Sequence, residues 1–356
     1  MRSCALFIIL IVLSIGGTSC NININTNPNT NANANTPERS STKSDNSYSL
    51  SQPPVNPPVR LIMDVSSVPN LRSVAPQALR YSGSTTWAPI RNEKSPITTA
   101  ILNSFPWFKL QYLPPPEGEA PGTPAAIDML ERGEIAFAQT SRELPECKEK
   151  TVNIKCIKVA RAFKAVAVHP SLPISALTVD QIDQICKGTI RNWRKIDPNA
   201  PDWDIVVYSR IVGTGNTPLS RSIGDECQKA ETDPIPTTLI NKLAKNPAGI
   251  LIHAAPIIVP QCTIKTLPVI NRSNQLVAPY KEPYISSSQC SEKLRNQVDV
   301  DVFKDGRYPK ELGDDMYIII KQNGKIQQQV GQAYAELLLS DEGQKKLEET
   351  GYVGNR

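Results

Sequence analysis

Between residues 78 and 350 the chain alternates short apolar runs with amphipathic segments. Apolar and β-branched runs predict strands at 78–82, 108–113, 135–139, 158–169, 205–208, 249–253, 264–267 and 316–321. Apolar residues at helical spacing predict helices at 95–104, 125–132, 178–186, 237–245, 326–339 and 341–350, with another from 217 to about 228. Strands that alternate with helices indicate an α/β fold. The length of 356 residues suits two to three domains or lobes.

The N-terminus predicts export. After Arg2, residues 5–15 form an apolar run that is typical of a secretion signal and too short to span a membrane. The following sequence, Gly17-Thr18-Ser19-Cys20, resembles a bacterial lipobox, so we expect residues 1–19 to be a signal peptide and Cys20 to be lipidated. Gly17 stands where a lipobox usually has Leu, which leaves cleavage by ordinary signal peptidase and free secretion as the alternative.

A low-complexity segment follows the signal. Asn alternates with Ile, Thr, Pro or Ala as far as residue 35, and Ser, Pro, Thr and Lys dominate the stretch after it. Such a composition buries too little apolar area to offset the entropy of ordering the chain. We therefore expect residues 20–74 to be a disordered tether between a membrane and a folded body.

Composition narrows the function classes. Hydrophobic residues make up 40% and charged residues 21%, as in ordinary globular proteins. The 39 Lys and Arg exceed the 34 Asp and Glu by only 5, which argues against a nucleic-acid partner. The two histidines, His169 and His253, are far apart in sequence, and no G-x-S-x-G motif is present. We therefore expect neither an enzyme nor a metal site.

Six cysteines lie beyond Cys20. An even number in an exported chain predicts disulfides, and the absence of a C-x-x-C pair argues against zinc. Six cysteines allow fifteen pairings. Proximity in the sequence favours Cys147 with Cys156, Cys186 with Cys227, and Cys262 with Cys290.

Three loops carry small hydroxyl residues immediately before a predicted helix. They are Ser84-Thr85-Thr86 after Gly83, Gly122-Thr123-Pro124, and Asn216-Thr217-Pro218. Thr before Pro is a helix-start signal, with the Thr as cap. Helix N-termini and hydroxyls together suit a tetrahedral oxyanion, and Arg142 and Arg210 near two of the loops add donor forks. Taken singly, each loop is better explained as a capped helix, and it is the recurrence of the pattern that favours an anion site.

From about residue 78 to the C-terminus the sequence resembles the phosphate-binding proteins of phosphate-specific ABC transporters, in the form common in cyanobacteria. The order and spacing of several motifs carry the resemblance. These are GSTTWAP (83–89), AFAQTSR (136–142), LTVDQ (177–181), CKGTIRNW (186–193), RIVGTGN (210–216), PAGI (247–250), LLSDEGQ (338–344) and GYV (351–353).

The resemblance implies a two-lobed periplasmic binding protein fold of type II, in which each lobe is a mixed sheet flanked by helices and the ligand lies between the lobes. We place the first lobe at 75–165 plus 268–356 and the second at 166–267. The implied ligand-binding residues are Ser84, Thr85, Thr86, Thr123, Ser141, Arg142, Arg210, Thr214, Gly215 and Asn216.

The implied function is capture of inorganic phosphate for an ABC transporter permease, without cofactor or catalysis. The protein would be a monomer in the periplasm, anchored by lipid to the outer face of the inner membrane. A module that acts as a sensor or scaffold, or one that binds sulfate, molybdate or phosphonate, stays open as an alternative.

Four departures from the family pattern bear on the ligand. Ser141 stands where some members have an Asp that accepts a proton from phosphate, so we expect weaker discrimination against sulfate; other members have Ser-Arg here, as this chain does. Asn216 replaces a Thr, and Pro124-Ala125-Ala126 replaces a glycine-rich stretch. Gly313-Asp314-Asp315 precedes Met316 in place of the usual Arg-Pro.

Overall fold

The computed structural model describes Met63 and residues 65–149, 153–210, 223, 227 and 230–355. The expected signal peptide, the expected lipidation site Cys20 and the helix expected at 217–228 lie outside the described residues, apart from two single positions of that helix. Within the described residues no helix is both long and apolar enough to cross a membrane.

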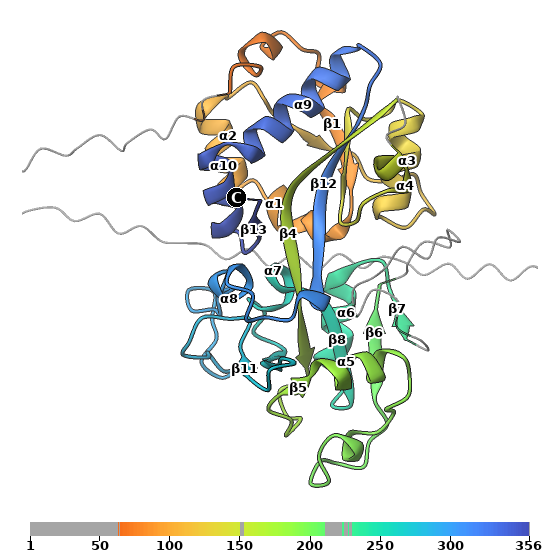
Figure 1. The fold of residues 1–356 in the computed structure, drawn as a ribbon, viewed down its shortest axis with the longest axis vertical. Helices are drawn as coiled ribbons and strands as arrows, with labels where there is room; N and C mark the ends of the chain where they lie inside the picture. The colour runs from red at the N-terminus through yellow and green to blue at the C-terminus, as the bar shows by residue number, and fades with distance from the viewer. Residues whose placement is uncertain are drawn as a thin grey trace, which may run out of the picture. The chain divides into compact units, whose positions relative to one another are not determined.

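One mixed sheet of ten strands runs through the fold (Figure 1). Its main path has the order β2-β1-β3-β12-β4-β8-β6-β7, and β9 and β13 also pair with β4. The strands are β1 (Arg80–Gly83), β2 (Gln111–Tyr112), β3 (Phe137–Thr140), β4 (Ile154–Val168), β6 (Val206–Ser209), β7 (Glu231–Thr232), β8 (Gly249–Ala254), β9 (Lys265–Leu267), β12 (Gly313–Lys321) and β13 (Val353–Gly354). A second sheet contains β5 (Leu177–Thr178), β10 (Val269–Ile270) and β11 (Leu276–Val277).

Helices pack against the sheets. They are α1 (Ala88–Arg91), α2 (Pro96–Ser104), α3 (Thr123–Glu131), α4 (Pro145–Glu149), α5 (Val179–Cys186), α6 (Pro236–Leu243), α7 (Ala255–Ile258), α8 (Asp301–Lys304), α9 (Ile326–Leu339) and α10 (Asp341–Glu349). Short 3₁₀ helices cover Pro69–Leu71, Pro76–Leu79, Thr85–Trp87, Trp193–Lys195 and Lys310–Leu312. The alternation of strands and helices confirms the α/β prediction.

The sequence signals for helix ends are confirmed at two helices. Thr178 caps α5, and the side chain of Gln181 accepts a hydrogen bond from the Thr178 backbone N–H, which completes a capping box. The last helix, α10, ends before Gly351, whose φ of +95° is a conformation that favours glycine. Local capping chemistry therefore sets these boundaries.

Strand β4 belongs to two hydrophobic cores. Its first part pairs with β12 as far as Phe163 opposite Gly313, and its last part pairs with β8 from Lys164 opposite Ala254 (Figure 1). Val159 and Ala160 are buried in the core that contains β1 and α9, whereas Ala165 to Val168 are buried in the core that contains β8 and α6. The strand partner changes between Phe163 and Lys164, whereas the core changes between Ala162 and Phe163, so the chain crosses from the first lobe to the second at 162–164.

The return crossing differs from its predicted position at 267–268. Val269, Phe303 and Leu312 are buried in the second core, whereas Met316 is buried in the first. The reason is that β10 pairs with β5, and the ring of Phe303 stacks on Phe163 with 4.6 Å between centroids. The crossing therefore lies at the start of β12, and residues 268–312 pack with the second lobe.

The predicted tether also extends too far. The structure buries Met63, Val65, Val68 and Leu71 in the first core, although all four fall within 20–74. The Met63 backbone N–H donates to the Ser104 hydroxyl at 3.2 Å. Single apolar residues spaced among Ser, Pro and Asn gave no periodic signal in the sequence, and the folded body begins by residue 63.

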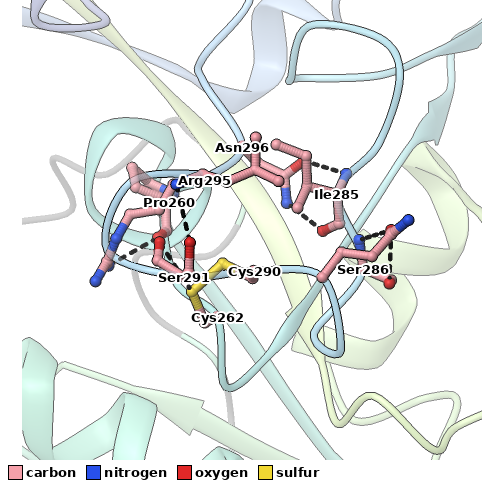
Figure 2. The surroundings of a disulfide bond; sticks show 10 residues. Pro260, Cys262, Ile285, Ser286, Cys290, Ser291, Arg295 and Asn296 are labelled. Atoms are coloured by element: carbon pink, nitrogen blue, oxygen red, sulfur yellow. Dashed lines mark hydrogen bonds between the residues drawn. A yellow bond between two sulfur atoms is a disulfide. The ribbon is translucent and has the colours of Figure 1, made fainter.

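Three disulfides join the cysteine pairs favoured by sequence proximity, which confirms that pairing. They are Cys147–Cys156, Cys186–Cys227 and Cys262–Cys290. Figure 2 shows the Cys262–Cys290 bond near the loop in which the Asn296 side chain donates to the Ile285 carbonyl and accepts from its N–H, both at 2.8 Å. The disulfide and this amide pair together close a long irregular segment.

Candidate functional site

Two of the predicted ligand loops begin at the carboxyl ends of neighbouring parallel strands. Strands β1 and β3 pair with Gly83 opposite Gln139, so the residues that follow them emerge side by side. The hydroxyl groups of Ser84 and Ser141 are 2.9 Å apart and hydrogen-bonded. A Cβ at Gly83 would lie 2.3 Å from the Gln139 carbonyl oxygen, so glycine is required here for close approach of the strands.

The Ser84-Thr85-Thr86 loop is buried and held from several sides. Ser84 Oγ accepts from the Thr86 backbone N–H at 3.3 Å and caps the 3₁₀ helix Thr85–Trp87. The Trp87 indole donates to the Thr140 carbonyl at 2.9 Å, and the Tyr352 hydroxyl donates to the Thr86 carbonyl at 2.7 Å. These bonds fix the loop before any ligand binds, which is the preorganisation that anion recognition needs.

Arg91 lies behind this loop. Its Nη2 donates to the Ser84 carbonyl at 2.7 Å, its Nε donates to Gln139 Oε1 at 3.1 Å, and its guanidinium stacks on the Tyr112 ring. Burial lowers the pKa of Arg91, and among the described residues no carboxylate forms an ion pair with it. The Ser84 carbonyl and the Thr85 N–H belong to one peptide group, so this cation polarises a donor of the loop.

Arg210 reaches the same loop from the second lobe. It follows β6 directly, and its Nη1 donates to Thr85 Oγ1 at 2.5 Å. Beside this contact lies a small cavity of about 20 Å³, which is room for about one water molecule. The cavity is lined by Thr86, Ala162, Lys164, Ser209, Arg210, Ile252, His253, Ala254 and Asp314.

The sequence analysis did not predict Lys164 and Asp314, an oppositely charged pair in this lining. Lys164 Nζ lies 2.9 Å from Asp314 Oδ2, and their side chains are only 8% and 16% exposed. The sequence did contain one signal for this pair, because Lys164 lies within the apolar run of β4. A lysine is rarely buried unless it is paired, so its position indicates a nearby carboxylate. Asp314 places a carboxylate in the lining of this cavity, at a position that the sequence marked only as a departure from the family pattern.

The remaining predicted site residues have mixed outcomes. The described residues bring together Ser84, Thr85, Thr86, Ser141 and Arg210. Thr123 is buried at the first position of α3 and does not line the cavity. Gly122 is the N-cap of that helix, so the prediction that Thr123 caps it was wrong.

The other predicted ligand residues are Arg142 and the loop of residues 214–216. Arg142 is partly exposed, and its Nε is buried without a hydrogen-bond partner in the described structure. Thr140 Oγ1 donates to the Arg142 carbonyl at 2.9 Å and holds the turn. Thr214, Gly215 and Asn216 lie outside the described residues. No group of three or more His, Cys, Asp or Glu residues suited to a metal ion occurs in the described part of the chain.

A family model described as a PBP superfamily domain matches residues 70–342. Among solved structures, the chain is similar to an ABC-type phosphate transport receptor from Vibrio cholerae (20% identity, TM-score 0.50, covering 77% of this chain and 98% of that one). It is also similar to a protein of Clostridium perfringens described as a phosphate ABC transporter substrate-binding protein with bound phosphate. The identity is 17% and the TM-score 0.55, and the match covers 78% of this chain and 99% of that one. A phosphate-binding protein from Stenotrophomonas maltophilia matches as well, with 10% identity and a TM-score of 0.50, over 77% of this chain and 90% of that one.

No curated protein matches this sequence. At identities of 20% or less, the similarity to solved structures shows a shared fold. The domain match covers more than half of the chain. This protein therefore belongs to the PBP superfamily and has the two-lobed fold of the periplasmic binding proteins.

Proposed function

We propose that this protein captures inorganic phosphate outside the cytoplasm and delivers it to the permease of an ABC transporter. The observation that carries the proposal is the contact between Arg210 and Thr85, because it joins an arginine from one lobe to a hydroxyl loop from the other. An arginine fork and short hydroxyls suit the oxygens of a tetrahedral anion. The phosphate ligands named for the Vibrio cholerae and Clostridium perfringens proteins support the choice of anion.

Binding needs no chemical step. The anion enters beside Arg210, accepts from its guanidinium, and takes further hydrogen bonds from the Thr85 N–H and from the hydroxyls of Ser84, Thr85 and Thr86. Ser141 is hydrogen-bonded to Ser84 and adds a further hydroxyl. Arg142 supplies a second guanidinium, since its Nε has no partner in the described structure. Closure of the lobes then excludes water and strengthens these bonds.

Asp314 favours phosphate over sulfate in this proposal. A carboxylate next to the anion repels a fully ionised dianion, whereas an anion that retains a proton can donate that proton to it. Near neutral pH phosphate carries such a proton and sulfate does not. Specificity then comes from a repulsive group as well as from attractive ones.

Location follows from the N-terminus. Residues 1–19 act as the signal peptide, and lipidation of Cys20 holds the protein at the outer face of the inner membrane. A linker from Cys20 to about residue 62 gives the body reach toward the permease. We propose that the protein acts as a monomer and that the lobes are bounded by the crossings at 162–164 and 312–316.

A calorimetric titration tests the proposal. The full-length protein is titrated with phosphate, sulfate, molybdate and a phosphonate, and we expect the lowest dissociation constant for phosphate. A lower constant for another oxyanion would reassign the ligand. Absence of binding to all four would reject capture and leave the sensor or scaffold alternative. Turnover of a chromogenic phosphate ester would instead indicate a hydrolase.

A further inference from the structure

The point where the chain first crosses between the lobes carries a buried ion pair. Strand β4 changes its partner between Phe163, opposite Gly313 of β12, and Lys164, opposite Ala254 of β8. Lys164 and Asp314 face each other at this change, one on each crossing strand. Both crossings therefore meet at one lysine and one aspartate.

The crossing strands border the cavity beside Arg210. The lining includes Ala162 and Lys164 from β4 and the consecutive residues 252–254 from β8. Arg210 and Thr86 also line it. Lys164 thus borders the space that the proposed function assigns to the anion.

Charge makes this lysine more than a structural element. Apart from His253, the ionisable residues of the lining are two cations, Lys164 and Arg210, and one carboxylate, Asp314. Lys164 and Arg210 bring positive charge to this space from β4 and from the end of β6. The site is shielded from solvent, where a charge acts strongly on an entering anion.

We propose that Lys164 is a ligand-binding residue whose ammonium contributes a positive charge to the bound oxyanion, and that Asp314 is the positioning residue that holds this ammonium in the cavity wall. The proposal rests on the proposed function, because it concerns the same cavity. It adds a binding residue from a crossing strand to those supplied by the strand-end loops.

The same two strands provide a matched control. Lys158 of β4 forms an ion pair with Asp315 of β12 at 2.9 Å, and their side chains are 39% and 32% exposed. This pair resembles the first in composition, distance and strands, but it does not line the cavity. Replacing Lys158 therefore removes a charge from β4 without touching the proposed site.

The experiment compares phosphate binding by full-length wild type, Lys164→Met, Lys164→Arg and Lys158→Met in calorimetry at low salt, with thermal melting followed by circular dichroism. We expect Lys164→Met to bind about tenfold more weakly or worse. Lys164→Arg should bind more tightly than Lys164→Met because it keeps the charge, and Lys158→Met should match wild type. If Lys164→Met does not fold, Lys164→Gln removes the charge but keeps a hydrogen-bonding end opposite Asp314, and it should show a similar loss.

Asp314→Asn separates binding from structure. It leaves the ammonium and removes the repulsive carboxylate, so we expect tighter binding of sulfate, which a merely structural ion pair would not produce. Equal affinity of wild type and folded Lys164→Met would overturn this inference and leave the proposed function standing. If wild type binds none of the oxyanions tested, both fall together.

Discussion

Gly83 offers the sharpest test of how the site is built. Replacing it with Ala would place a Cβ 2.3 Å from the Gln139 carbonyl oxygen, 2.6 Å from its Cβ and 2.8 Å from its N, where ordinary contact begins at 3.4 Å. Two of these atoms are backbone within the β1–β3 pairing, so side-chain rotation cannot relieve the clash. The end of β1 must move by about 1 Å away from β3.

The loss of stability in Gly83→Ala follows from the packing and the hydrogen bond that this movement disrupts. Overpacking of a tight core costs roughly 1–3 kcal/mol, and loss of the 2.8 Å bond from the Ser84 N–H to the Gln139 carbonyl adds about 1 kcal/mol. We expect the free energy of unfolding of Gly83→Ala to fall by about 2–4 kcal/mol. Because Ser84 begins the anion loop, phosphate affinity should fall by about tenfold or more.

Urea denaturation gives the first quantity and calorimetry the second. Gly122→Ala is the matched control, because its Cβ would meet Pro124 Cδ at an ordinary 3.7 Å, with no closer contact beyond the adjacent residues. This control should lose less than about 1 kcal/mol, the scale of a weakened helix cap. If Gly83→Ala were as stable as Gly122→Ala and bound phosphate as wild type does, the close packing of β1 on β3 would not be what positions the loop.

Three further outcomes are expected. Arg210→Ala should cost about 2–5 kcal/mol of anion affinity, as when one partner of a buried charged pair is truncated, and an unchanged dissociation constant in calorimetry would remove Arg210 from the site. Cys20→Ala should release the protein from membranes on fractionation, whereas continued retention would reject the lipid anchor. Peptide mapping without reductant should detect no reactive thiol among the six disulfide cysteines, and stoichiometric alkylation there would contradict the three bonds.

Local signals in the sequence predicted local structure well. The helix expected at 326–339 is α9 with the same bounds, and the cap expected at Thr178 is present. Both depend on residues within one or two turns of each other, where periodicity and capping act directly. The disulfide pairs also follow from closeness in the sequence.

Long-range packing was not predictable in the same way. Residues 268–312 join the second lobe through β10 on β5 and Phe303 on Phe163, which are contacts between distant segments with no local signature. Asp314 was noted only as a departure from a family pattern, because its pairing with Lys164 requires β4 and β12 to lie side by side. The sequence therefore predicted the loops of the site but not the strand face between them.

The position of each charge explains how one small space can accept an anion. Arg91 acts from behind the Ser84–Thr85 peptide, Arg210 from the opposite lobe, and Lys164 from the crossing strand. A cavity of about 20 Å³ holds a single water, so an anion with four oxygens requires the Arg210–Thr85 hydrogen bond to open. The anion then replaces Thr85 as the acceptor for Arg210, while the Thr85 hydroxyl turns to donate. Since one charged hydrogen bond is exchanged for several, affinity depends on how well Ser84, Arg91 and Asp314 hold the surrounding groups in place.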